Sequence, residues 1–234
     1  MTDPYYADEW VTLYHGDCLE ITDWLAADVL VTDPPYGRAW RQGQVRKLSG
    51  RRGRHATNAV ASVGIANDQS VETRDAALSL WRGEAIVFGD LMLAPPRGVK
   101  LVGIYGKPAD AGLRGTVAGV RRDAEAIYFL GFRGGGIGGR SSIFITRASN
   151  VGNPHGLVAR SGGHPHAKAL DVLEDLINLC PPGVIADPFA GSGSTLVAAK
   201  ALGRKAIGVE LEERYAEIAA RRLAQDVLDF GEPA

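Results

Sequence analysis

An acid, two prolines and an aromatic residue directly follow an apolar run in residues 29–38, VLVTDPPYGR. Each proline fixes its φ angle and lacks a backbone donor, so Pro34 and Pro35 stiffen the segment that carries Asp33 and Tyr36. The Asp33 carboxylate and the Pro34 carbonyl are two acceptors, which match the two donors of a planar amino group. The segment therefore predicts a site for an exocyclic amine.

The amine of a nucleobase is a poor nucleophile because its lone pair is delocalised into the ring. Acceptors on both N–H groups draw the nitrogen toward tetrahedral geometry, and rigid prolines keep those acceptors aligned. Tyr36 can stack on the base, which must be flipped out of a duplex to reach the site. The alternative is a structural proline turn with a capping Asp33 and a packed Tyr36.

A second candidate site lies in residues 183–194, GVIADPFAGSGS. Gly191 and Gly193 come between a predicted strand and a predicted helix, where backbone N–H groups can meet a polar ligand. Leu196 stands where a dinucleotide fingerprint needs its third glycine, so that fingerprint is incomplete. The next predicted strand ends at Glu210, which is placed to accept both hydroxyls of a ribose. The loop indicates an adenosine-like cofactor, or else a plain turn with Glu210 as a helix cap.

The elements that must position these segments alternate between strand and helix patterns. Strands are predicted over 10–17, 28–33, 84–90, 100–106, 125–131, 183–188 and 205–211. Helices are predicted over 18–26, 71–81, within 164–182, 195–203 and 213–225. This alternation predicts an α/β fold, a mostly parallel, doubly wound sheet with helices on both faces. Ligands bind outside the carboxyl ends of such strands, so both Asp-Pro ends are expected on one rim.

Composition narrows the class of protein. The chain has 234 residues, of which 45% are hydrophobic and 23% charged, which suits one large folded domain. Apolar runs are too short to span a bilayer, and residues 1–10 lack the pattern of a secretory signal, so we expect a cytoplasmic protein. Cys18 and Cys180 have no ligand-like spacing, which predicts two buried thiols and no metal site.

Charge is distributed unevenly although the net charge is only −1. Residues 38–67 contain no acid and predict a basic, mobile loop beside the proline turn, with DNA contact favoured over a merely solvated loop. Its basic residues are Arg38, Arg41, Arg46, Lys47, Arg51, Arg52 and Arg54. Residues 131–163 are rich in glycine and serine, read as irregular, and add the candidate DNA contacts Arg140 and Arg147.

Together these segments resemble the S-adenosylmethionine-dependent amino-methyltransferases of DNA. DPPYG at 33–37 is similar to their catalytic signature, and DPFAGSGS at 187–194 to their cofactor loop. The catalytic motif comes first, which resembles the permuted order of the β class of bacterial and phage enzymes. The resemblance extends to Gly16-Asp17, to HPHAK and LEDLI before the cofactor strand, and to AIGVE and RYAEIAARR after it.

The resemblance implies a Rossmann-like class I methyltransferase fold, circularly permuted, with residues 1–234 as one catalytic domain and a small target-recognition insertion at 131–163. It implies that Asp33, Pro34, Pro35 and Tyr36 engage the target base. Ala169 departs from the proline that the family usually has there, which weakens the match at the preceding lysine. S-adenosylmethionine would be bound by Asp17, His164, Lys168, Asp187, Phe189, Ala190, Gly191, Gly193 and Glu210.

The implied partner is double-stranded DNA, and no membrane is involved. Asp at 33 favours N6 of adenine as the target amine, with N4 of cytosine as the alternative. An RNA methyltransferase and a silent nucleic-acid-binding module on the same fold are further alternatives, and Leu196 disfavours a nicotinamide dehydrogenase. The family also suggests a homodimer and a cognate restriction enzyme as partners.

Overall fold

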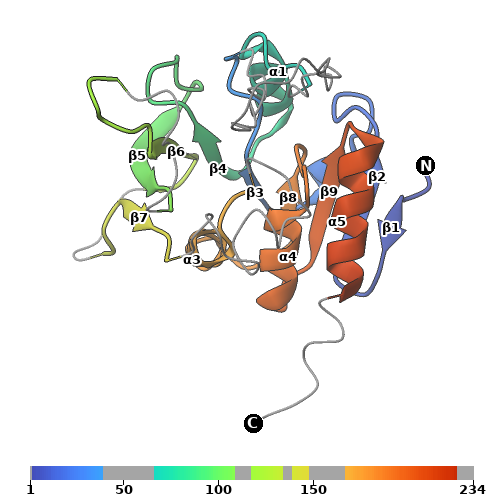
Figure 1. Ribbon diagram of the computed structural model, residues 1–234. Helices are drawn as coiled ribbons and strands as arrows, with labels where there is room; N and C mark the ends of the chain where they lie inside the picture. Colours follow the sequence, from blue (N-terminus) through green and yellow to red (C-terminus); the bar gives the residue numbers. More distant parts are fainter. Residues whose placement is uncertain (1, 39–65, 109–116, 134–138, 148–166, 226–234) are drawn as a thin grey trace, which may run out of the picture.

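The computed structural model describes residues 2–38, 66–108, 117–133, 139–147 and 167–225. Within them one nine-stranded sheet has the order β1-β2-β9-β8-β3-β4-β6-β5-β7 (Figure 1). The strands are β1 (Tyr6–Ala7), β2 (Val11–His15), β3 (Val29–Thr32), β4 (Glu84–Gly89), β5 (Val99–Gly106), β6 (Ala124–Leu130), β7 (Ile143–Ile145), β8 (Ile185–Asp187) and β9 (Ala206–Glu210). The helices are η1 (Asp23–Ala26), α1 (Glu72–Leu80), α3 (Leu170–Ile177), α4 (Ser194–Ala201) and α5 (Glu213–Gln225).

Strand direction explains which residues reach the functional rim. The five neighbours β2, β9, β8, β3 and β4 are parallel, so their carboxyl ends share one edge of the sheet. Strand β6 is antiparallel to both β4 and β5, and its second residue, Glu125, pairs with Tyr105 near the carboxyl end of β5. Consequently β6 brings its first residues to this rim. The predicted mostly parallel α/β sheet is confirmed.

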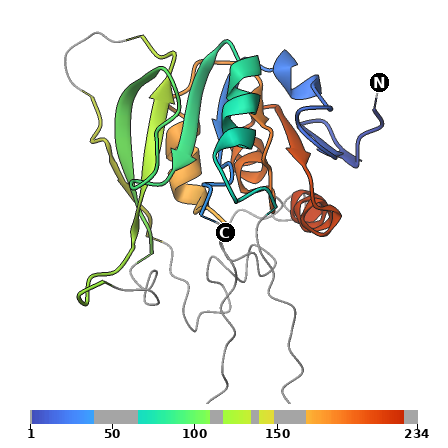
Figure 2. The ribbon, with the colours of Figure 1, turned by 90° about the horizontal axis from the view of Figure 1, so that it is seen from above.

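Strand β3 shows how the core forms on both faces of the sheet. Val29 and Val31 pack in the cluster that contains α3, α4 and α5, whereas Leu30 packs in the cluster that contains α1 and η1. All three side chains are fully buried, as expected for a central strand that is apolar on both faces. Figure 1 shows α3, α4 and α5 in a row, with α1 apart from them. Figure 2 shows β5, β6 and β7 at the side of the sheet far from α5.

The helix predicted over 18–26 is wrong. The Asp17 carboxylate accepts from the Leu19 amide at 2.8 Å, and the Asp17 carbonyl accepts from the Ile21 amide at 2.8 Å, which forms a tight turn instead. The Trp24 indole N–H donates to the Cys18 carbonyl at 2.9 Å. Only η1 follows, so the apolar spacing that resembles a helix serves a loop whose Ile21 and Trp24 side chains are buried.

The interpretation of residues 131–163 as irregular is also partly wrong, because β7 lies within them and pairs in parallel with β5. The strand has only three residues, and only Phe144 among them is buried, so it leaves no periodic signal.

Cys18 and Cys180 are buried free thiols, and burial raises the pKa of each to about 12. Among the described residues, no helix has the length and apolar character needed to cross a membrane.

Candidate active site

The two Asp-Pro segments follow neighbouring parallel strands. Strands β3 and β8 pair directly, and the Thr32 hydroxyl at the end of β3 donates to Asp187 Oδ1 at 2.7 Å. The sequence prediction that both segments lie on one rim is therefore correct. What differs between them is the set of partners that hold their acids.

Two side chains of the proline turn are hydrogen-bonded to each other, and one of them also to a carboxylate from β6. The Tyr36 hydroxyl lies 2.7 Å from Asp33 Oδ1 and 3.1 Å from Glu125 Oε2, so its single proton has two carboxylates within reach. Gly37 ends the turn at φ +80°, and a Cβ there would lie 2.8 Å from the Ser70 carbonyl carbon. The turn thus positions Tyr36 against the acids through backbone geometry that requires glycine.

Lys168, in the segment just before α3, contacts the same two carboxylates. Its buried ammonium pairs with Asp33 Oδ2 and lies 3.4 Å from Glu125 Oε2. Burial raises the pKa of Asp33, and Lys168 opposes that rise. Although burial would lower the pKa of Lys168, the two carboxylates raise it above its usual range. Lys168 was expected to bind the cofactor, and in the structure its ammonium contacts Asp33 and Glu125.

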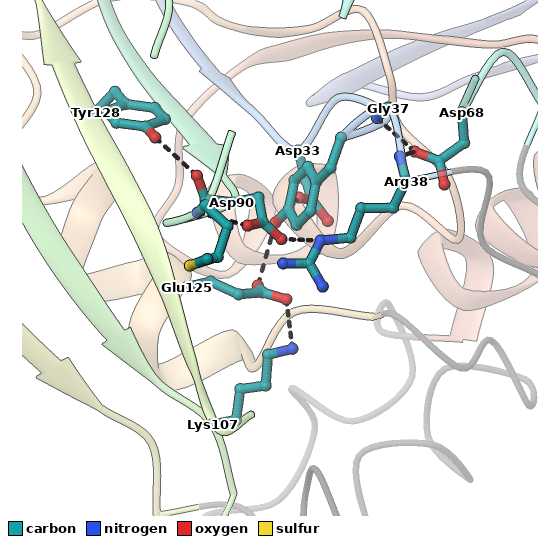
Figure 3. A network of polar contacts seen from close by, with 10 residues as sticks. Asp33, Gly37, Arg38, Asp68, Asp90, Lys107, Glu125 and Tyr128 are labelled. Carbon is teal, nitrogen blue, oxygen red and sulfur yellow. Dashed lines mark hydrogen bonds and ion pairs between the residues drawn. The ribbon is translucent and has the colours of Figure 1, made fainter. Parts of the chain in front are cut away.

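Glu125 is a buried residue of this site that the sequence interpretation missed. Its Oε1 pairs with Lys107 Nζ at 2.5 Å (Figure 3). Burial would raise the pKa of Glu125, but Lys168 and Lys107 lower it to about 2. The available signal was an acid at the start of an otherwise apolar strand. We name Asp33 and Glu125 the amine-side acids.

The glycine loop is bound to the end of β9. The Gly191 amide donates to Glu210 Oε2 at 2.7 Å, and the Glu212 amide donates to Glu210 Oε1 at 2.8 Å. Gly193 adopts φ +79° before α4, and a Cβ there would lie 2.8 Å from the Ala219 Cβ on α5. The glycines therefore allow both the turn and a close approach of α5.

The packing of Leu196 shows why the dinucleotide fingerprint lacks its third glycine in this chain. A Cβ on Gly208 of β9 would lie 2.6 Å from the Leu196 side chain, which is fully buried. The close contact between helix and strand thus depends on a glycine in the strand rather than in the helix. The Arg222 guanidinium of α5 donates to the Ser192 carbonyl at 2.5 Å and braces the loop from the other side.

Three further acids, which we name the cofactor-side acids, are Asp17, Asp187 and Glu210. They follow or end β2, β8 and β9, whose carboxyl ends are neighbours because β9 pairs in parallel with both β2 and β8. Burial raises the pKa of Asp187 to about 6 and that of Glu210 to about 7. Phe189, at the start of the loop, is half-buried, and Ala190 is buried with its amide bonded to the Val209 carbonyl at 2.9 Å.

Of the predicted DNA contacts, the structure describes three. Arg38 pairs with the buried Asp90, and the Gly37 amide donates to Asp68 Oδ1 at 2.7 Å (Figure 3). Arg140 pairs with Asp175 at 2.8 Å on the surface. Arg147 is exposed, and its amide donates to Asp171 at 2.9 Å. The residues Arg41, Arg46, Lys47, Arg51, Arg52, Arg54 and His164 lie outside the described residues.

The fold is the Rossmann-like fold of the class I methyltransferases. The solved structure of M1.HpyAVI with S-adenosylmethionine has a TM-score of 0.56 and 19% identity and covers 91% of this chain and 99% of that one. The PvuII DNA methyltransferase (cytosine-N4-specific) has a TM-score of 0.62 and 16% identity, over 97% of this chain and 93% of that one. Both likenesses concern the fold.

The sequence comparisons identify the family. The N6_N4_Mtase family, described as DNA methylase, matches residues 99–221, which is more than half of the chain. The YubD protein of Escherichia coli (strain K12) is 29% identical over 216 residues, which are 89% of this chain and 88% of that protein. The chain belongs to this family of DNA methylases.

The chain is thus an S-adenosylmethionine-dependent DNA amino-methyltransferase, and its rim fits that cofactor. Carboxylates on three adjacent strands supply acceptors for hydroxyl and amine donors. Gly191 and Gly193 take the positive φ that the turn at the start of α4 requires. The matched family region begins after residues 33–37, so the assignment of the proline turn depends on its own geometry.

Proposed function

We propose that this enzyme methylates N6 of a flipped adenine in double-stranded DNA. The observation that carries the proposal is the Asp33 carboxylate, held on a rigid Pro-Pro turn and lying 2.7 Å from the hydroxyl of Tyr36. In the signature that this turn resembles, Asp rather than Ser favours adenine. The Tyr36 ring, half-buried at the same turn, suits stacking against the flipped base.

The chemistry assigned to the chain is orientation and activation of the amine. Asp33 and the Pro34 carbonyl accept its two N–H groups and direct its lone pair toward the cofactor side of the rim. S-adenosylmethionine, when bound, supplies a methyl group on a sulfonium centre. Held by Asp33 and the Pro34 carbonyl, the amine nitrogen would take up that methyl group as the carbon–sulfur bond breaks and the cofactor leaves as a neutral thioether, and the methylated amine would then release one proton to solvent.

The DNA side of the proposal depends on arginines among the described residues. Arg38 follows the turn, and the exposed Arg147 follows the carboxyl end of β7, at the same rim. Arg140 precedes β7 and lies on the surface against α3. Contacts from such residues to phosphates position a duplex without reading its sequence. We further infer that the enzyme acts in the bacterial cytoplasm, and that a homodimer and a cognate restriction enzyme are partners to be tested.

N4 of cytosine is the second candidate. The acceptor pair at Asp33 and Pro34 binds an exocyclic amine and does not distinguish the ring that carries it. The PvuII DNA methyltransferase, which shares the fold, is cytosine-N4-specific. Both candidates use the same turn and the same transfer step.

The deciding experiment identifies the methylated nucleoside. Unmethylated duplex DNA is incubated with labelled S-adenosylmethionine and the protein, and the DNA is digested to nucleosides. N6-methyladenine that disappears with Asp33→Ala supports the proposal. N4-methylcytosine would overturn the base assignment. A parallel incubation with RNA that gives label in RNA but none in DNA would overturn the assignment of DNA as the substrate.

A further inference from the structure

Both carboxylate oxygens of Asp33 have a partner before any base arrives. Its Oδ1 accepts from the Tyr36 hydroxyl at 2.7 Å, and its Oδ2 pairs with the Lys168 ammonium. A target amine that donates one N–H to this carboxylate must share an oxygen with one of these donors or displace it. Whichever donor gives way needs another acceptor nearby, because an unpartnered buried donor is costly.

Glu125 is in place to be that acceptor. Its Oε2 lies 3.1 Å from the Tyr36 hydroxyl and 3.4 Å from the Lys168 ammonium, the same two donors that occupy Asp33. Both donors can therefore shift to Glu125 by small movements rather than by leaving the site. The Tyr36 phenol has a single proton, so it donates fully to only one carboxylate at a time.

Glu125 is itself held firmly. It lies at the start of β6, in register with Tyr105 of β5, and is only 8% exposed. Its other oxygen pairs with Lys107, which balances part of its charge, and Figure 3 shows Glu125 between Lys107 and the proline turn. With Asp33 and Lys168 the cluster has two carboxylates and two ammonium groups.

We infer that Glu125 is a positioning residue that receives the Tyr36 hydroxyl or the Lys168 ammonium when one N–H of the target amine takes that donor's place on Asp33. This role rests on transfer to an amine bound by Asp33, whichever base carries it. Glu125 touches neither the base nor the methyl donor in this scheme. It acts by keeping Asp33 available, so its loss should reduce turnover and not cofactor binding.

The test is a double-variant cycle between Glu125→Gln and Tyr36→Phe, with total label transferred to unmethylated duplex DNA as the rate. Glu125→Gln should lower kcat by about 10²-fold and leave the calorimetric Kd for S-adenosylmethionine within about three-fold, which is less than 1.4 kcal/mol. In the Tyr36→Phe background, which keeps the ring and lacks the hydroxyl, the further loss should shrink to about ten-fold or less, since one donor no longer needs Glu125.

Asp123→Asn is the matched control, since Asp123 precedes β6, pairs with Arg121 at 3.2 Å and is partly exposed. Its rate should stay within about two-fold of the original enzyme. If Glu125→Gln does not fold, Glu125→Asp supplies the same cycle, because it withdraws the acceptor by one methylene while keeping the charge. Melting temperatures establish which variants are folded.

Equal losses in the two Tyr36 backgrounds, or a cofactor affinity that falls as far as kcat, would overturn the role of Glu125. The wild-type digest tests the proposed function separately. N4-methylcytosine there would overturn the adenine assignment and leave the cycle intact. Label in neither base would overturn both, because no amine transfer to DNA would remain for Glu125 to support.

Discussion

The two groups of acids at the rim are held in different ways. The cofactor-side acids Asp187 and Glu210 accept mainly from backbone amides and from the Thr32 hydroxyl, groups fixed by the fold itself. The amine-side acids Asp33 and Glu125 share ammonium groups and a phenol, which have several rotatable bonds. The partners of the cofactor-side acids are thus fixed in place, whereas the partners of the amine-side acids can exchange between the two carboxylates. This difference fits the proposed roles. The cofactor would bind to groups that are already in place, whereas the target amine would displace a donor from Asp33.

The largest expected effects come from one variant in each group of acids, Asp33→Asn and Glu210→Gln. Asp33→Asn should lower the rate of methyl transfer by about 10³-fold, since the acceptor at the reacting nitrogen loses its charge. Its Kd for S-adenosylmethionine should stay within about three-fold. Glu210→Gln should instead weaken cofactor binding by about ten-fold or more, with a smaller loss of rate at saturating cofactor. Rates and calorimetric affinities measure both, and a variant that damages both quantities alike would break the comparison.

The second expected effect is on stability and follows from burial of Glu210. Its pKa in the folded protein is raised from 4.5 to about 7, so the folded state holds the proton more tightly than the unfolded state. This contribution to stability is fully present below pH 4.5 and is lost as the pH rises through 7, in total about 3 kcal/mol.

Glu210→Gln lacks that titration. Its melting temperature relative to the original protein should therefore rise by about 5–10 °C between pH 4.5 and pH 8. Thermal unfolding of both proteins without cofactor, at several pH values, measures the difference. A gap that stays constant across this range would show that Glu210 is not the group that titrates.

The smallest expected effect concerns the predicted DNA contact at Arg140. Arg140 and Asp175 form an exposed pair, so Arg140→Ala and Asp175→Asn should each change stability by less than about 1 kcal/mol. Only Arg140→Ala should weaken DNA binding, by a few-fold, and reduce the slope of log affinity against log salt by about 1. Equal DNA affinities for the two variants would remove Arg140 from the DNA surface.

Much of the fold was predictable because its signals are local. Short apolar strands that end in Asp-Pro, together with α5 at 213–225, identified a mostly parallel sheet and one rim. Asp33 and Glu210 could be placed there because a strand's carboxyl end is visible in its own sequence. The missed strand β7 is too short to show periodicity, and residues 18–26 have a helical spacing that Asp17 and Trp24 turn into a loop.

Glu125, and the contact of the predicted site residue Lys168 with Asp33, could not be found in this way. Glu125 reaches the rim only because β6 runs antiparallel between β4 and β5, and strand direction is decided by pairing between distant segments. Lys168 meets Asp33 across 135 residues of sequence. No local pattern encodes either contact, so the chemistry of single residues was predictable and the partners that tune it were not.

The parallel pairing of β2 with β9 has a consequence for how the enzyme is made. Strands β4 to β7 come from one stretch of the chain. The cofactor-side half of the sheet instead joins the early strand β2 to the late strands β8 and β9, and the Asp8–Lys200 contact of this half spans 192 residues of sequence. Pairings over such separations form slowly and only after both partners exist. A ribosome releases the proline turn long before β9. An unfinished chain therefore carries the proline turn, with the proposed amine site, while it still lacks β9 and the Glu210 carboxylate.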